Sequence, residues 1–181
     1  SDVISSCRCW YNFIYFGHNP KLIHVLDGGL KKWIRENKPI TNSLSQIKIS
    51  NYKSNEKKEL VKNKEEIDKN ILTNEFKVID ARSHERFKGE IPEPRKGLRS
   101  GSIKNSFCLP FSDLINKDGT FINKDKIFEK FKSTRCELDI NLVFTCGSGV
   151  TASVLALAYS LIDNKYMPKV YDGSWSEYGK I

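Results

Sequence analysis

The sequence lacks long hydrophobic runs and contains only one methionine and three histidines. No stretch of about 18 apolar residues occurs, so the chain is not expected to span a membrane. Its start has no charged region followed by an apolar stretch, and no secretory signal peptide is expected. The histidines, His18, His24 and His84, show no paired metal-ligand spacing. The sequence therefore predicts neither a metal site nor another cofactor.

Cysteine is scarce and irregularly spaced. The chain has five cysteines, at positions 7, 9, 108, 136 and 146, and none of them forms a C-x-x-C pair. The odd number argues against a disulfide framework, and the spacing argues against a zinc site. Unpaired thiols are typical of a reducing environment. The sequence thus predicts an intracellular protein, cytoplasmic or mitochondrial.

Positive charge exceeds negative charge, with 30 Lys and Arg against 22 Asp and Glu. Between about residues 36 and 70, however, Lys, Asn and Glu are interleaved. This mixture indicates a solvated segment and not a basic stripe, so no nucleic-acid partner is expected. A moderate net charge of +8 favours the attraction of small anionic substrates.

Composition divides the chain into three parts. Residues 1–40 read as the end of one α/β unit, with an aromatic helix over 4–16, a short strand over 22–26 and a helix over 30–36. Residues 41–58 are polar and nearly of low complexity, which is typical of an interdomain linker. Residues 59–181 form a second unit.

The second unit alternates strands with helices, and this alternation predicts an α/β fold with a parallel sheet. Strands are expected over 76–80, within 102–110, over 140–144 and over 169–171. Helices are expected over 59–72, over 123–134 with Ile127, Phe128 and Phe131 facing inward, and over 150–162. Trp175 is expected in the core.

A glycine-rich turn that starts with Cys146 connects the apolar run 140–144 to a helical pattern. Glycines allow such a turn to curl, so that successive N–H groups point inward beside a helix N-terminus. A thiol that faces these groups carries a larger thiolate fraction and is a candidate nucleophile. On the turn alone, a structural cysteine at a strand end fits equally well.

Parallel α/β sheets bind ligands beyond the carboxyl ends of their strands. Three features follow such ends: the charged loop 89–101 downstream of Asp80, the Cys146 turn, and the turn at 172–174. The arginine-bearing loop and the cysteine turn are therefore expected to face each other.

Several motifs, in this order and spacing, resemble the rhodanese superfamily, and most closely its two-domain thiosulfate/3-mercaptopyruvate sulfurtransferases. They cover about residues 72–179: Val78-Ile79-Asp80-Ala81-Arg82, Arg86-Phe87-x-Gly89, Glu93-Pro94-Arg95, Ser100-Gly101-Ser102-Ile103, the turn 146–152, and Tyr171-Asp172-Gly173-Ser174-Trp175. The resemblance implies a three-layer fold with a central, mostly parallel sheet flanked by helices. It also implies that 25–33, which repeats the pattern of 170–175, ends a non-catalytic N-terminal rhodanese domain.

The resemblance implies sulfur transfer in two half-reactions. Cys146 would take a sulfur atom from a small anionic donor as a persulfide and pass it to cyanide or to a thiol such as glutathione or thioredoxin. Backbone N–H groups of the turn would stabilise the negative charge. The turn residues that the resemblance assigns to this binding are Gly147, Gly149, Val150 and Thr151.

The charge of the turn indicates which sulfur donor the site prefers. The turn carries no basic residue and has a hydroxyl at Ser148. It therefore resembles the type that uses 3-mercaptopyruvate more than the type that uses thiosulfate. In that type two arginines hold the donor carboxylate, which matches Arg86 and Arg95, and Ser148 belongs to a proton relay with residues of the N-terminal domain. A solvated basic loop is the alternative for the arginines.

Two rival functions stay open at this stage. A cysteine-dependent phosphatase needs an arginine in the turn to clamp phosphoryl oxygens, and none follows Cys146. A non-catalytic rhodanese-like binding module usually lacks the turn cysteine, which is present here. Asp80 and Arg82 match the family motif but, at a strand end, are expected to form an internal ion pair.

Overall fold

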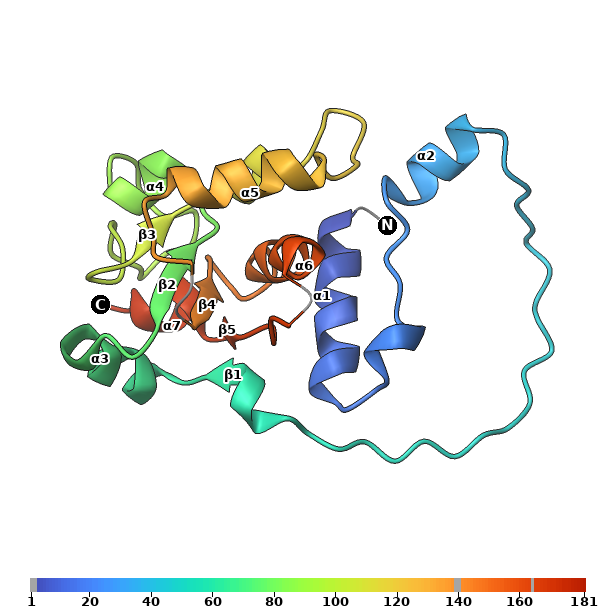
Figure 1. Ribbon diagram of the computed structural model, residues 1–181, viewed down its shortest axis with the longest axis horizontal. Helices are drawn as coiled ribbons and strands as arrows, with labels where there is room; N and C mark the ends of the chain where they lie inside the picture. Colours follow the sequence, from blue (N-terminus) through green and yellow to red (C-terminus); the bar gives the residue numbers. More distant parts are fainter. Residues whose placement is uncertain (1–2, 139–140, 164) are drawn as a thin grey trace.

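A parallel sheet forms the centre of the computed structural model, which describes residues 3–138, 141–163 and 165–181. Five strands of these residues lie in the order β1-β5-β4-β2-β3 (Figure 1). They are β1 (Val61–Lys62), β2 (Lys77–Asp80), β3 (Phe107–Cys108), β4 (Leu142–Thr145) and β5 (Val170–Tyr171). Every pairing between them is parallel, which confirms the predicted α/β class.

Helices cover both faces of the sheet. On one face lie α1 (Val3–Tyr15), α5 (Lys124–Ser133) and α6 (Ala152–Ile162), and on the other lie α3 (Lys64–Thr73) and α7 (Ser174–Tyr178). Successive strand residues alternate between these faces, so Phe144 joins the first core and its neighbour Val143 joins the second. The three-layer arrangement is therefore confirmed. Helices α2 (Gly29–Arg35) and α4 (His84–Lys88) contribute no residue to either hydrophobic core.

The segment predicted as one helix over 59–72 is divided in the structure. A 3-10 turn (Lys58–Leu60) leads into β1, which pairs with β5, and α3 begins only at Lys64. The boundary is set by Asn63, whose side chain accepts from the Glu66 N–H at 2.9 Å while Glu66 accepts from the Asn63 N–H at 3.0 Å. This reciprocal capping box starts a helix at a defined residue.

Two other expectations are wrong. The residues 22–26 form no strand, and Leu22 and Leu26 are exposed, because no neighbouring strand of the described chain offers them a hydrogen-bonding partner. Phe128 is also exposed, whereas Ile127 and Phe131, one turn apart on α5, are buried. Ile140, expected in the central strand, lies outside the described residues.

Helix α1 belongs to the same core as the sheet. It packs against α6, and its Cys7, Tyr11 and Ile14 are buried there. The Tyr11 hydroxyl donates to the carbonyl oxygen of Leu60 at 2.7 Å. Residues 36–57 contain no helix or strand and loop away from the body of the molecule before they return to β1 (Figure 1). The division into 1–40, 41–58 and 59–181 remains a prediction.

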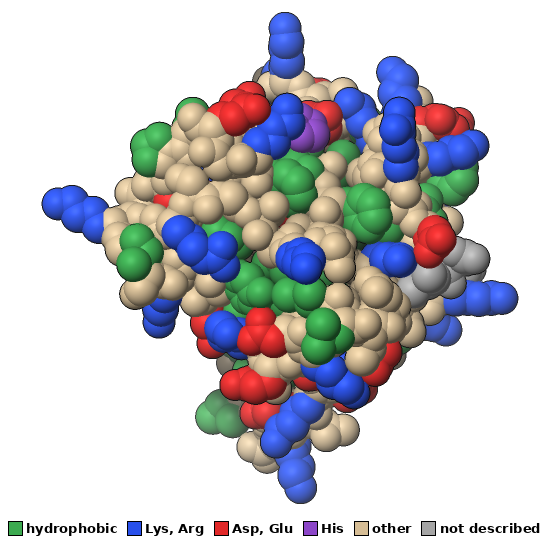
Figure 2. All heavy atoms as spheres, turned by 90° about the vertical axis from the view of Figure 1, so that its left-hand side faces the viewer, with side chains coloured by type: hydrophobic (Ala, Val, Ile, Leu, Met, Phe, Trp, Pro, Cys, Tyr) green, Lys and Arg blue, Asp and Glu red, His purple; other side chains and the backbone are tan. Residues whose placement is uncertain are grey.

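Cationic side chains are dispersed over the surface. On the face shown in Figure 2, most Lys and Arg side chains are spread among acidic and uncharged groups, and a few lie together at the upper right. Some lysines of the described residues form exposed ion pairs with neighbours, such as Lys64 with Asp68 at 2.6 Å. Among the described residues, no helix is long and apolar enough to cross a membrane.

Candidate active site

The reactive turn lies at the carboxyl end of the central strand. β4 ends at Thr145, Cys146 follows, and α6 begins at Ala152. Cys146 is 1% exposed and borders a hollow of about 180 Å³. The hollow is lined by the cysteine turn and the arginine-bearing loop, through Arg86, Glu93, Pro94, Arg95, Leu98, Cys146, Gly147, Ser148, Val150 and Thr151. The two segments that were expected to face each other therefore do so.

The N–H groups of the turn divide into two sets. One set is occupied: the Ser148 N–H donates to the Cys146 sulfur at 3.4 Å, and the Gly149 N–H donates to the Ser174 hydroxyl oxygen at 3.0 Å. The N–H groups of Gly147, Val150 and Thr151 donate to no other described residue. Since these three residues line the hollow, their N–H groups can stabilise an anion there.

Gly149 differs from the other turn residues predicted to bind substrate. It does not line the hollow, and its N–H is already occupied by Ser174. Its φ of +78° lies in the left-handed region, and a Cβ atom there would lie 2.7 Å from Asp172 Oδ1 and 2.8 Å from the Asp172 carbonyl oxygen. We therefore infer that Gly149 maintains the conformation of the turn and does not bind the substrate.

Ser174 belongs to one of the sequence motifs, but the sequence predicts no role for it. Its buried hydroxyl oxygen accepts from the Cys146 N–H at 3.2 Å as well as from Gly149, and the hydroxyl donates to the Tyr171 carbonyl at 2.9 Å. Its φ is +49°, in a region that disfavours side chains. The matching residue of the first repeat, Gly29, has a similar φ of +60° but carries no side chain. A serine where the repeat carries glycine was the available signal.

Arg86 and Arg95 both reach the hollow but differ in their partners. The Arg86 guanidinium pairs with the Glu93 carboxylate at 2.5 Å and lies against Gly147, where a Cβ atom would be 3.0 Å from Nη2. Arg95 is exposed and forms no ion pair with the described residues. Arg86 is therefore held in place before any ligand arrives, and Arg95 is available to move onto one.

A buried ion-pair network supports this arrangement. Arg82, 1% exposed at its side chain, pairs with Asp80 at 2.7 Å and with Glu93 at 2.7 Å. The predicted internal pair of Asp80 and Arg82 is thus confirmed. Arg82 also lies over the buried ring of Trp175, 4.4 Å from its centroid, and Trp175 is confirmed as a core residue. Through Glu93, the network determines the position of Arg86.

A larger cavity lies elsewhere in the described part of the chain. It measures about 590 Å³, lies between α1, the residues 20–27, the residues 121–127 and α6, and is lined by no cysteine or arginine. Its lining is mostly apolar and includes His24, Asp27 and Lys124, but it holds no thiol that could act as the nucleophile. The smaller hollow at Cys146 is therefore the candidate active site.

Replacing Gly149 with alanine is expected to distort the turn. The added Cβ atom would overlap Asp172 and would also meet the unfavourable positive φ, so we expect a loss of about 2 kcal/mol or more in unfolding free energy. Gly97 is a matched control, because it has the same φ of +78° and no atom within 4 Å of the added Cβ position. Urea unfolding of both variants checks this, and equal losses would contradict it.

The fold and the site define a rhodanese-type protein, and comparison with known proteins agrees. The family described as "Rhodanese-like domain" matches residues 63–180, so the chain belongs to this family. It is 36% identical over 174 residues to human "3-mercaptopyruvate sulfurtransferase", with 96% of this chain and 58% of the human protein aligned. It is also 36% identical to mouse "Thiosulfate sulfurtransferase", with 94% and 57% aligned.

Solved structures show the same arrangement. The 3-mercaptopyruvate sulfotransferase SseA from Escherichia coli superposes with a TM-score of 0.80 at 28% identity, over 97% of this chain and 64% of that one. Tum1 from Saccharomyces cerevisiae gives 0.82 at 26% identity, over 98% and 63%. This chain thus spans somewhat more than half the length of the relatives it matches.

Proposed function

We propose that this chain carries the persulfide-forming site of a sulfurtransferase with Cys146 as the nucleophile. One observation carries the proposal: the thiol borders a small hollow that combines unoccupied backbone N–H groups with two arginines. Such a site stabilises an anion at the sulfur and holds a second anionic group at a distance from it. The relatives named above favour sulfur transfer over phosphate transfer or binding alone.

The reaction begins when the Cys146 thiolate attacks the sulfur of the donor. With 3-mercaptopyruvate, the new S–S bond forms as the C–S bond breaks, the electron pair stays on carbon, and the thiol proton of the donor ends on that carbon. Pyruvate and the enzyme persulfide result. Cyanide or a thiolate then attacks the outer sulfur, the S–S bond breaks, and the Cys146 thiolate is regenerated.

We further propose 3-mercaptopyruvate as the preferred donor, with thiosulfate also accepted. The turn itself has no charged residue between Cys146 and Ala152, so no side-chain charge in it compensates the two charges of thiosulfate. The carboxylate of mercaptopyruvate instead meets Arg86 and Arg95, which line the same hollow. A planar guanidinium suits a carboxylate because it can donate two parallel hydrogen bonds.

Ser148 and the sulfur acceptor complete the proposal. Ser148 lines the hollow and is half-buried, which suits a hydroxyl that relays a proton to or from the donor. Glutathione, thioredoxin and cyanide are the acceptor types we propose. All five cysteines are free, which fits a reducing compartment, cytoplasmic or mitochondrial.

Replacing Arg95 with glutamine tests both the site and the donor. We expect the KM for 3-mercaptopyruvate to rise about ten- to hundredfold with a smaller change for thiosulfate, because a charge-assisted hydrogen bond to the carboxylate is lost. Lys96→Gln removes the same charge from the next residue, which does not line the hollow, and should leave KM within about twofold. Steady-state transfer to cyanide measures both, and equal effects would refute the clamp.

A further inference from the structure

Arg8 of α1 contacts the reactive turn although it lies far outside the residues 63–180 that match the family. Its Nη1 atom donates to the Gly149 carbonyl oxygen at 3.2 Å and pairs with Asp172 Oδ1 at 2.5 Å. Its side chain is 27% exposed. One guanidinium therefore joins three segments: the first helix, the cysteine turn and the turn that follows β5.

The contact with Gly149 has a consequence for the next N–H group. The Gly149 carbonyl and the Val150 N–H belong to one planar trans peptide, in which they point in opposite directions. Arg8 holds the Gly149 carbonyl on the side of α1. Arg8 itself does not line the hollow. The Val150 N–H is thereby directed away from Arg8, and Val150 borders the hollow.

Apart from Arg8, little holds the orientation of the Gly149–Val150 peptide. The Ser153 hydroxyl also donates to the Gly149 carbonyl, but at a longer 3.4 Å. A glycine at φ +78° has no side chain to oppose rotation of the peptide that follows it. The ion pair itself is partly exposed, with Asp172 46% exposed at its side chain, and such pairs add little to global stability.

We propose that Arg8 is a positioning residue for sulfur transfer: it holds the Gly149–Val150 peptide so that the Val150 N–H faces the reacting sulfur. The inference rests on the proposed function of Cys146. It predicts that Arg8 affects the chemical step and not donor binding, because Arg86 and Arg95 contact the donor and Arg8 does not.

The test compares Arg8→Met with Arg8→Lys in the full chain. We expect Arg8→Met to lower the single-turnover rate of persulfide formation about ten- to hundredfold, since one aligned N–H donor is lost, while the donor concentration at half-maximal rate changes less than about twofold. Arg8→Lys keeps a cation that can donate to the same carbonyl and should recover part of the rate. A mass gain of one sulfur atom on the chain reports the persulfide.

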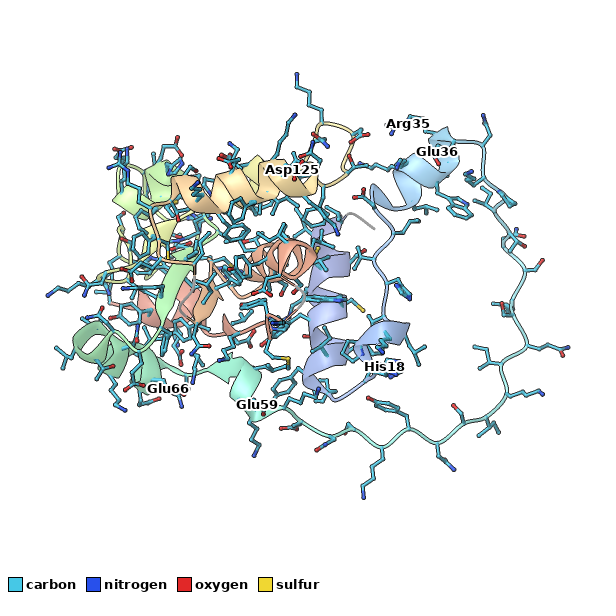
Figure 3. The ribbon with its side chains drawn as sticks, in the orientation of Figure 1. His18, Arg35, Glu36, Glu59, Glu66 and Asp125 are labelled. Atoms are coloured by element: carbon cyan, nitrogen blue, oxygen red, sulfur yellow. The ribbon has the colours of Figure 1, made fainter. Side chains whose placement is uncertain are left out.

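Arg35→Met is the matched control. Arg35 is also an arginine of the N-terminal segment, paired across the chain with Asp118 at 3.4 Å, and it lies on α2, well separated from β4 and β5 (Figure 3). We expect it to leave the rate of persulfide formation unchanged. A rate for Arg8→Met equal to that of Arg35→Met, or a loss confined to the half-maximal donor concentration, overturns the proposal.

A second readout separates this inference from the proposed function. Alkylation of Cys146 by iodoacetamide needs no sulfur donor and depends on stabilisation of the thiolate by the turn. We expect Arg8→Met to slow alkylation several-fold and Arg35→Met to leave it unchanged. If the wild-type chain transfers no sulfur but shows this slowing, the proposed function fails and the role of Arg8 stands. Unchanged or faster alkylation in Arg8→Met refutes that role.

Discussion

Replacing Cys146 with alanine is expected to abolish sulfur transfer, with a loss of roughly 10⁴-fold or more in turnover. No other group of the hollow can form the covalent intermediate, and the loss of a nucleophile removes that route completely. The variant should still fold, because alanine replaces a small buried thiol. Mass spectrometry after incubation with 3-mercaptopyruvate should show a persulfide only on the chain that keeps Cys146.

The other cysteines provide the controls. Burial raises the pKa of Cys108 to about 12 and that of Cys136 to about 11, so both thiols stay protonated at neutral pH. Cys108→Ala and the exposed Cys9→Ala are therefore expected to keep full activity. If turnover survived in Cys146→Ala and vanished in Cys108→Ala, the nucleophile would be Cys108 and not Cys146. That result would refute the proposal.

Replacing Arg82 with methionine is expected to cost about 3–5 kcal/mol of unfolding free energy, the range for breaking a buried ion pair. The change leaves two carboxylates, Asp80 and Glu93, each 1% exposed at its side chain, without their common cation. Methionine has a similar volume, so loss of charge dominates over loss of packing. Because Glu93 also holds Arg86, the folded fraction should bind the donor more weakly.

Chemical unfolding measures the loss of unfolding free energy in Arg82→Met. An exposed ion pair provides the control. Asp113 and Lys130 lie 2.9 Å apart with side chains 37% and 43% exposed, so Asp113→Asn should cost less than about 1 kcal/mol. A cost for Arg82→Met no larger than that of Asp113→Asn would mean that the buried network contributes nothing to stability. That result would also remove the basis for the fixed position of Arg86.

Local patterns predicted the features that depend on neighbours in sequence. The apolar run before Cys146 and the glycines after it are sufficient for a strand, a turn and a helix, which the structure contains as β4, the reactive turn and α6. The same reasoning failed at 22–26 and at 59–72. An apolar run becomes a strand only where another strand pairs with it, as Val61 pairs with Val170.

The sequence alone therefore determined the α/β class, the candidate nucleophile Cys146 and the two arginines that share its hollow. The class follows from the alternation of strands and helices, Cys146 follows from the local turn motif, and the arginines follow from the resemblance of several ordered motifs to one family. Only the tertiary structure brings Ser174 and Arg8 to the turn, because their contacts with it span 25 and 141 residues. A motif cannot encode such contacts, since they arise from the packing of α1 on α6 and from the hydrogen bonds of α7 with the turn.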